Sequence, residues 1–277
     1  MKRKNIKTDV ALIYFLELVK TKYLHFGYWE EGDGLTLKNL QAAQERFIEK
    51  MIEFIPEGVQ TILDVGCGVG GNALKLKERG FIVESLSPDP FQQKVFEENT
   101  HHEIPFHLTT FEEFECDKRF DLVLMSESVQ YIAMEPGFKK SREVLKDGGF
   151  LLAADIFKTE DAPEVRYKRR AQPHLLEEYL RCASSSGFQL IRQQCIASQV
   201  LPTLMWGNMV YADYLKPIGK ATLTALQMRR PWLYSILKRL YRPKGISIEE
   251  LLERILNMTP EVFSKYMTYM ISLFQKG

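Results

Sequence analysis

The feature that most constrains the fold is a cluster of glycines directly after a short apolar segment. Residues 61–65 (TILDV) have strand character, the turn GCGVGG follows at 66–71, and 72–80 (NALKLKERG) has helical character. Clustered glycines at a strand-to-helix turn let a ligand approach the backbone closely. A second strand, FIVESL at 81–86, completes the unit, so we predict a nucleotide-type ligand here rather than a purely structural turn.

Strand-like and helix-like segments alternate beyond this unit. We expect strands at 105–110, 120–126, 149–157 and 188–197, and helices at 89–100, 137–149 and 174–187. Such alternation predicts an α/β fold with a doubly wound, mostly parallel sheet that is covered on both faces. A ligand of such a sheet binds at the carboxyl ends of the strands.

Two helical segments, 8–23 and 36–54, precede the first strand and are joined by an aromatic loop at 23–34. A stretch from about 201 to 260 is mainly helical and too short to have a core of its own, so we interpret it as an insertion. The apolar tail favours a last strand, although a helix is the alternative. We therefore divide the chain into an N-terminal helical lid (1–55), a core (56–198), a helical insertion that caps the acceptor (199–262) and the final strand (263–277).

Composition excludes several classes of function. Lys and Arg number 37 against 36 Asp and Glu, so no global charge attracts nucleic acid. The four cysteines are scattered without metal-ligand spacing, which indicates reduced thiols in the cytoplasm and no metal site. No apolar run reaches the roughly 20 residues that a membrane-spanning helix needs.

The segment 63–70, LDVGCGVG, resembles the first motif of the class I (Rossmann-like) S-adenosylmethionine (SAM)-dependent methyltransferases. The resemblance implies that SAM is the cofactor and S-adenosylhomocysteine the product. It also implies that Gly66 and Gly68 let the methionine part of SAM approach the backbone, and that Asp64 orients the turn. Cys67 would pack within this cofactor-binding motif and not act as a nucleophile.

The second strand departs from the usual pattern. Ser85 occupies the position where an acid commonly binds the ribose hydroxyls, and a serine can still donate a hydrogen bond there. Glu84 or Asp89 would be the alternative if the register were different. The LSP segment that begins at Leu86, followed by Gln92, is similar to the cyclopropane-fatty-acid, sterol and tocopherol methyltransferase group.

Two further segments carry the resemblance. Thr110 and Phe111 stand where the adenine is usually held, with Thr110 in place of the acid often seen there. Residues 120–132, FDLVLMSESVQYI, look like the fourth-strand segment that ends near the acceptor. Ser126, Glu127 and Tyr131 are therefore expected to line the active cleft. The alternative is a capped strand end with a packed tyrosine.

The aromatic loop contains HFGYW at 25–29, which is similar to a segment near the N-terminus of small-molecule methyltransferases. Aromatic faces can cover a sulfonium cation and exclude water, so we expect Tyr23, Tyr28 and Trp29 to contact the cofactor. A packed aromatic turn is the alternative. The candidates for a general base are His25, Glu127, Tyr131 and His174.

The resemblance implies a SAM-dependent methyltransferase that acts on N, O or C of a small, largely apolar acceptor such as a secondary metabolite, quinone, sterol or terpenoid. A cyclopropane-synthase-like enzyme and a non-catalytic SAM-binding protein are the alternatives. No [DNS]PP[YF]-like segment or Pro-Cys nucleophile points to nucleic-acid methylation.

Met, Trp and Tyr side chains between 205 and 241 are candidates for acceptor contact. The basic, acid-free stretch 222–247 is compatible with peripheral membrane contact, and we expect a monomer or homodimer.

Overall fold

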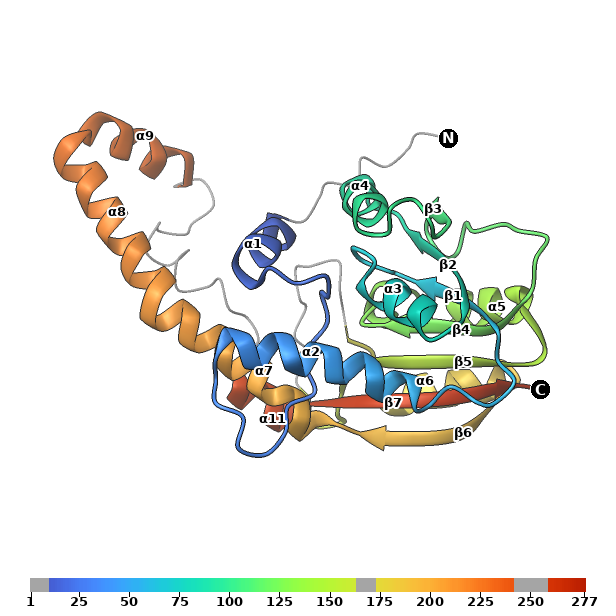
Figure 1. Cartoon of the computed structure of the whole chain (residues 1–277). Helices are drawn as coiled ribbons and strands as arrows, with labels where there is room; N and C mark the ends of the chain where they lie inside the picture. Colours follow the sequence, from blue (N-terminus) through green and yellow to red (C-terminus); the bar gives the residue numbers. More distant parts are fainter. Residues whose placement is uncertain (1–9, 163–172, 242–258) are drawn as a thin grey trace.

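The computed structural model describes residues 10–162, 173–241 and 259–277, and these residues build one mixed sheet (Figure 1). Its spatial order is β3-β2-β1-β4-β5-β7-β6. In chain order the strands are β1 (Thr61–Val65), β2 (Ile82–Ser87), β3 (Phe106–Leu108), β4 (Phe120–Ser126), β5 (Leu145–Lys158), β6 (Phe188–Cys195) and β7 (Met267–Lys276).

The sheet has the predicted doubly wound character. Strands β3, β2, β1, β4 and β5 pair in parallel, whereas β7 lies antiparallel between β5 and β6. The predicted fold class, a mostly parallel α/β sheet with N-terminal helices and a helical insertion before the last strand, is thus confirmed. Because β1, β2 and β4 are parallel, their carboxyl ends meet at one edge.

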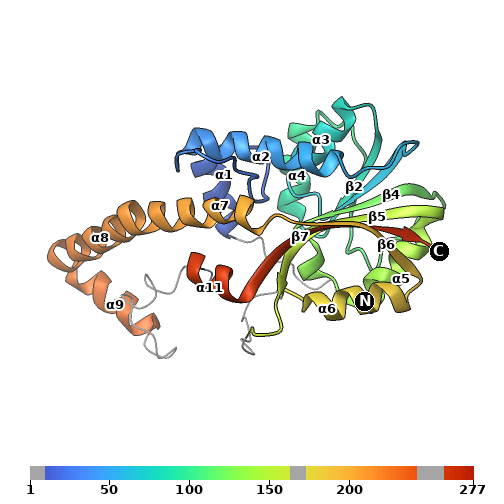
Figure 2. The same cartoon turned by 90° about the horizontal axis from the view of Figure 1, so that it is seen from below.

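Helices cover both faces of the sheet (Figures 1 and 2). They are α1 (Val10–Val19), α2 (Leu37–Ile52), α3 (Gly71–Glu78), α4 (Pro90–Asn99), α5 (Met134–Val144), α6 (Leu176–Ser185), α7 (Ala197–Val210), α8 (Lys216–Arg229), α9 (Pro231–Tyr241) and α11 (Pro260–Tyr266), with a 3-10 turn η1 (Val129–Tyr131) and a π-helical turn η2 (Tyr211–Leu215). One buried cluster packs α2, α3, α4 and α7 on one sheet face, and a second packs α5 and α6 on the other.

Several predicted boundaries were wrong, and two of them have a clear physical reason. The helix expected over 137–149 ends at Val144, and residues 145–149 already belong to β5 because Leu145 pairs with Phe120 of β4. The tail expected to be a strand from residue 263 is helical through Tyr266, since Thr259 caps α11 and Pro260 occupies its first turn. In both places tertiary pairing or a cap, not local hydrophobicity, decides where the element changes.

The helical insertion does not cover the sheet along its whole length. Helix α7 packs on the sheet, but the continuous helix runs on through η2 into α8, which has no buried residue. In both views α8 extends away from the sheet, and α9 turns back at its far end (Figures 1 and 2). Within the described ranges, no helix combines the length and the apolarity needed to cross a bilayer.

We predict that replacing Gly71 by alanine destabilises the fold. A Cβ on this residue would overlap the carbonyl oxygen of Lys22 and would lie 2.6 Å from the Tyr23 ring, so the aromatic loop could not pack on α3. We expect a loss of about 1–3 kcal/mol in the free energy of unfolding, measured by chemical denaturation.

The matched control is Gly207→Ala in α7, where a Cβ would meet no atom within 4 Å. Alanine is the better helix former, so this variant should be unchanged or more stable by up to about 1 kcal/mol. Equal stabilities for the two variants would show that the loop does not depend on contact with α3.

Candidate active site

Three buried polar atoms without hydrogen-bond partners gather at the carboxyl edge of the sheet. The strand register places Asp64 of β1 directly beside Ser85 of β2, and Ser126 ends the neighbouring β4. Asp64 Oδ2, Ser85 Oγ and Ser126 Oγ are all buried and unpaired within the described structure. Burial raises the pKa of Asp64 to about 7. Unsatisfied buried polar groups are rare, so these atoms mark a place where a polar ligand would complete the structure.

The glycine turn is shaped by its protein neighbours. Gly66 has a φ of +75°, and a Cβ there would overlap Ser128, whose hydroxyl donates to the Val65 carbonyl oxygen at 2.6 Å. The Gly66 and Cys67 amides both donate to the Leu86 carbonyl oxygen, at 2.9 and 3.2 Å. The turn is therefore fixed between the ends of β2 and β4 and needs glycine for close packing as well as for its left-handed φ.

The aromatic loop lies over this turn. Leu24 packs against Gly68, where a Cβ would be 3.0 Å from the leucine side chain, and the Lys22 carbonyl oxygen lies against Gly71. Gln44 of α2 donates from its buried amide to the His25 carbonyl oxygen at 2.7 Å. The structure thus places residues 22–25 beside the predicted cofactor motif.

His25 is buried and has no ring nitrogen directed at open space. Nδ1 lies 2.7 Å from the Phe26 carbonyl oxygen, Nε2 lies 3.0 Å from the Asn72 amide oxygen, and the ring stacks on Phe47. Burial lowers the pKa of His25 to about 4, so the imidazole is neutral near pH 7. This geometry favours a role in holding the loop on α3 over proton transfer.

The other aromatic residues of the loop are directed into the protein. Tyr23 is buried and donates to Glu45 at 2.8 Å, while the Tyr28 backbone pairs with α2. Trp29 is buried too, and its indole Nε1–H donates to Thr203 Oγ1 of α7 at 2.8 Å. These contacts resemble the packed aromatic turn that the sequence left as the alternative.

Some of the polar side chains near the end of β2 lie beside the predicted cofactor site, and others make contacts elsewhere. Ser87 donates to Gln92 at 2.6 Å, which places the glutamine beside the LSP segment. Glu84 instead pairs with His107 and Lys118, and Asp89 caps α4 by accepting from the Phe91 amide. Ser85, whose hydroxyl is unpaired, is consequently the better candidate for a ribose contact.

Thr110 and Phe111 follow β3. Phe111 is 2% exposed and belongs to the cluster that packs α5 and α6, whereas the Thr110 hydroxyl accepts from the Glu113 amide at 3.3 Å. The structure therefore places the Phe111 ring in the core, and contact of Thr110 or Phe111 with an adenine stays a prediction.

Glu127 is the centre of a second polar cluster, directly after β4. Its φ of +54° is rare for a residue other than glycine. One carboxyl oxygen, Oε1, accepts from the Phe26 amide at 2.6 Å and from the Tyr269 hydroxyl of β7 at 2.9 Å. Burial, with a smaller contribution from the nearby Asp155, raises the pKa of Glu127 to about 8. A strained residue with a raised pKa is typical of a functional position.

Tyr131 and His174 do not belong to the hydrogen-bonded cluster around the Glu127 carboxyl. Tyr131 lies on η1 and is 61% exposed. His174 Nε2 donates to the carbonyl oxygens of Val129 and Ile132, at 3.1 and 2.9 Å, and so supports the loop that follows Glu127. No hydrogen bond of the described residues joins either side chain to the Glu127 carboxyl.

Sequence reasoning missed four residues of this region. Asn72, Thr203 and Tyr269 contact the aromatic loop or Glu127 from distant parts of the chain, and no local pattern indicates those partners. Asp155 is fully buried in β5, and burial raises its pKa to about 7. An acid inside the apolar run LLAADIF is a signal that could have identified it.

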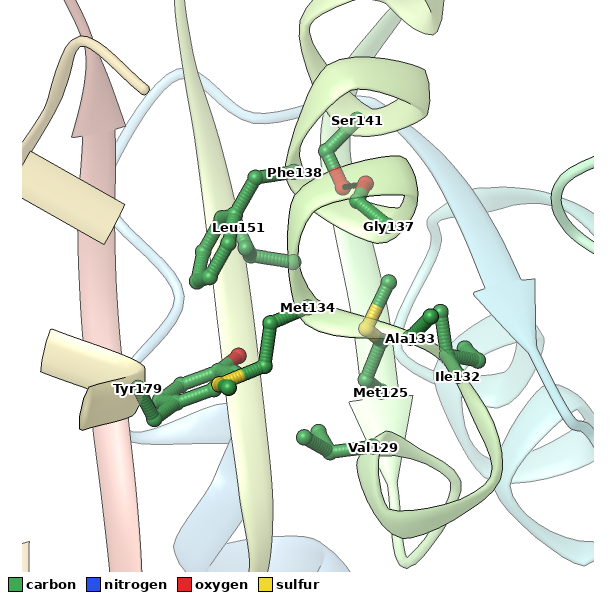
Figure 3. A pocket seen from close by; sticks show the side chains of 10 residues that line it. All are labelled: Met125, Val129, Ile132, Ala133, Met134, Gly137, Phe138, Ser141, Leu151 and Tyr179. Atoms are coloured by element: carbon green, nitrogen blue, oxygen red, sulfur yellow. Dashed lines mark hydrogen bonds between the residues drawn. The ribbon is translucent and has the colours of Figure 1, made fainter. Parts of the chain in front are cut away.

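A shallow apolar pocket lies between β4, α5 and α6, on the side of β4 that faces away from Asp64 and Ser126 (Figure 3). Its lining includes Met125, Met134, Phe138 and Tyr179 but no charged side chain. Figure 3 shows the Met134 side chain beside the Tyr179 ring. None of the predicted site residues lines this pocket, and it lacks the polar groups that SAM requires.

The residues at the carboxyl edge fit SAM. The cofactor offers hydroxyl, amino and carboxyl groups, and the unpaired atoms of Asp64, Ser85 and Ser126 supply buried donors and acceptors of matching kind. Their position at the reversal of strand order between β1 and β4 is the usual place for a nucleotide in a doubly wound sheet.

Comparison with known proteins gives the same result. The family described as "Methyltransferase domain" matches residues 63–153. The 2-methyl-6-phytyl-1,4-hydroquinone methyltransferase of Synechocystis sp. is 28% identical over 83% of this chain and 70% of its own length. The ubiquinone biosynthesis O-methyltransferase of Rickettsia akari is also 28% identical, over 53% of this chain and 61% of its own length.

Solved structures share the fold. Mycolic acid cyclopropane synthase superposes with a TM-score of 0.68 at 18% identity, covering 97% of this chain and 94% of that one. Geranyl diphosphate C-methyltransferase from Streptomyces coelicolor gives 0.68 at 12% identity, covering 99% and 95%. With the glycine motif and the strand order, these matches identify the chain as a SAM-dependent methyltransferase whose fold is that of the class I enzymes.

Proposed function

We propose that this methyltransferase methylates N, O or C of a small, largely apolar acceptor such as a quinone, sterol, terpenoid or other secondary metabolite. The observation that carries the proposal is the set of unpaired buried polar atoms at the carboxyl edge, adjacent to the Glu127 cluster. Relatives named for a phytyl hydroquinone, ubiquinone biosynthesis and geranyl diphosphate support an apolar acceptor.

The cofactor would be held by residues on three neighbouring strands. Asp64 and the Gly66–Gly68 backbone would hold the amino acid part, Ser85 with Gln92 would hold the ribose, and the backbone near Thr110 would hold the adenine. Ser126 would lie between cofactor and acceptor. When bound, SAM supplies an electrophilic methyl group on a sulfonium centre. The aromatic loop would exclude water and hold the acceptor in line, which accounts for much of the rate in such transfers.

Glu127 is our proposed general base. Both of its donors, the Phe26 amide and the Tyr269 hydroxyl, bind the same oxygen, Oε1. This arrangement would fix the carboxyl through Oε1 and leave Oε2 to accept a proton from the acceptor. A pKa near 8 makes the carboxylate a stronger base than an exposed glutamate. His25 and His174 would act as positioning residues, because both ring nitrogens of His25 and Nε2 of His174 already bind backbone or amide groups.

Two other functions are alternatives. The likeness to a cyclopropane synthase favours an enzyme that modifies a lipid alkene, in which case the product would be a ring and not a methyl group. A non-catalytic SAM-binding protein would bind the cofactor without turnover. We further propose a cytoplasmic monomer or homodimer that touches a membrane through part of the stretch 222–247, of which residues 242–247 lie outside the described residues.

We predict that Asp64→Asn weakens binding of S-adenosylhomocysteine by about 10- to 100-fold, because a hydrogen bond to a charged group contributes about 1.5–3 kcal/mol. Isothermal titration calorimetry measures the affinity. The matched control is Asp121→Asn at the opposite end of the strands, where the carboxylate accepts from Gln60, Thr61 and Lys146.

The control variant should lose stability but keep the affinity for S-adenosylhomocysteine. An unchanged affinity in the Asp64 variant would place the cofactor elsewhere, and absence of binding by the folded parent chain would contradict the assignment of the site.

We predict that kcat/KM rises with pH through about 8, as the Glu127 carboxyl loses its proton and becomes a base. Glu127→Gln should abolish this rise and lower kcat by about 100-fold or more. Tyr269→Phe should retain the rise but move it to higher pH, since the lost hydrogen bond stabilises the charged carboxylate. A Glu127→Gln variant with the parent rate and profile would exclude this residue as the base.

Acceptor class can be tested by transfer of a labelled methyl group from SAM. We expect turnover with prenylated hydroquinones or other isoprenoid acceptors and none with RNA or protein. A cyclopropane-synthase-like activity would instead appear as a ring product from unsaturated phospholipid, detected by mass spectrometry. Cofactor binding without turnover across these acceptors would favour the non-catalytic alternative.

A further inference from the structure

The segment formed by η2, α8 and α9, residues 211–241, is a helical arm with little contact to the rest of the fold. Helix α8 has fourteen residues and none is buried. Both views show the arm leading away from the sheet (Figures 1 and 2). Helix α8 extends the packed helix α7, but its own residues gain no stability from tertiary packing, so the arm would gain stability from a partner surface.

Apolar side chains form an exposed stripe along the arm. Tyr214, Ile218, Ala225 and Met228 recur at a spacing that places them on one helix face, and all four are exposed, Met228 by 78%. On α9, Trp232 is 61% exposed and Ile236, one turn later, is exposed as well. Large apolar side chains in such a row mark an interaction surface.

The same arm has a net positive charge. Lys220, Arg229, Arg230, Lys238 and Arg239 are exposed, and the sequence has no Asp or Glu between Tyr214 and Ser247. Because the whole chain has a formal net charge of only +1, the remainder of the protein is net negative. Positive charge is therefore concentrated on the part of the molecule that also exposes the apolar stripe.

We propose that the arm docks on an anionic membrane surface. Exposed apolar side chains, a tryptophan and many cations on short helices are the combination that binds the headgroup region of anionic bilayers. A second copy of this chain is a poorer partner, since two such arms would repel each other. The surface begins at Tyr214, before the basic stretch 222–247, and includes both helices.

This inference extends the proposed function without depending on which atom is methylated. The arm continues directly from α7, whose Thr203 hydroxyl accepts from the Gly27 amide at 3.0 Å and from the Trp29 indole. Docking would thus hold the aromatic loop and the site close to a surface in which apolar acceptors dissolve.

The test is cosedimentation of the full chain with phosphatidylcholine vesicles, with and without phosphatidylglycerol. We expect binding to the anionic vesicles only, and release at high salt. Arg229→Gln/Arg230→Gln and Met228→Ser/Trp232→Ser should each weaken binding by about tenfold or more. The control, Lys38→Gln/Lys94→Gln, removes two exposed cations from other surfaces and should bind as the parent does.

Titration with S-adenosylhomocysteine shows that each variant is folded and tests the cofactor site separately. Absence of vesicle binding, equal binding to both vesicle types, or arm variants that bind like the control would each overturn the proposal. A parent dimer that dissociates in the arm variants, without vesicle binding, would assign the surface to a second copy. None of these results would alter the methyltransferase assignment.

Discussion

The site depends on one carboxyl oxygen, Glu127 Oε1, which joins three parts of the chain that are far apart in sequence. It accepts from the Phe26 amide of the aromatic loop and from the Tyr269 hydroxyl of β7, while its own residue directly follows β4. Burial disfavours the charged carboxylate, and the two donors offset part of that penalty. The same contacts that position the loop therefore set the proton affinity of the proposed base.

Local patterns predicted the strands at the site well. The segments 61–65 and 120–126 are strands with the expected bounds, because short apolar runs between turn residues determine them. Pairing then places Ser85 beside Asp64. Tyr269 and Thr203 could not be predicted in this way, since each meets its partner across more than a hundred residues, whereas buried Asp155 gave a signal in its apolar strand.

The aromatic loop shows why composition alone does not assign a role. Its tryptophan and first tyrosine suit a cover over a sulfonium ion, yet Trp29 binds Thr203 and Tyr23 binds Glu45, and both rings are buried in protein. What lies over the glycine turn is Leu24 and backbone. Direct contact of Tyr23, Tyr28 and Trp29 with the cofactor stays a prediction, and the loop's contacts with α2, α3 and α7 are what hold it there.

Helix α7 connects the candidate site with the helical arm. Thr203, which holds the aromatic loop, is separated from Tyr214 by eleven residues, or about 17 Å along an α-helix. The π-helical turn at Tyr211–Leu215 lies at the junction, and such turns are frequent at functional sites. On the proposed docking, an acceptor with a long apolar tail could reach the strand ends while its tail stayed near the bilayer. An acceptor without such a tail would gain nothing from the arm. Partition of apolar groups into the bilayer would therefore favour both the binding of the arm and the choice of an acceptor with an apolar tail.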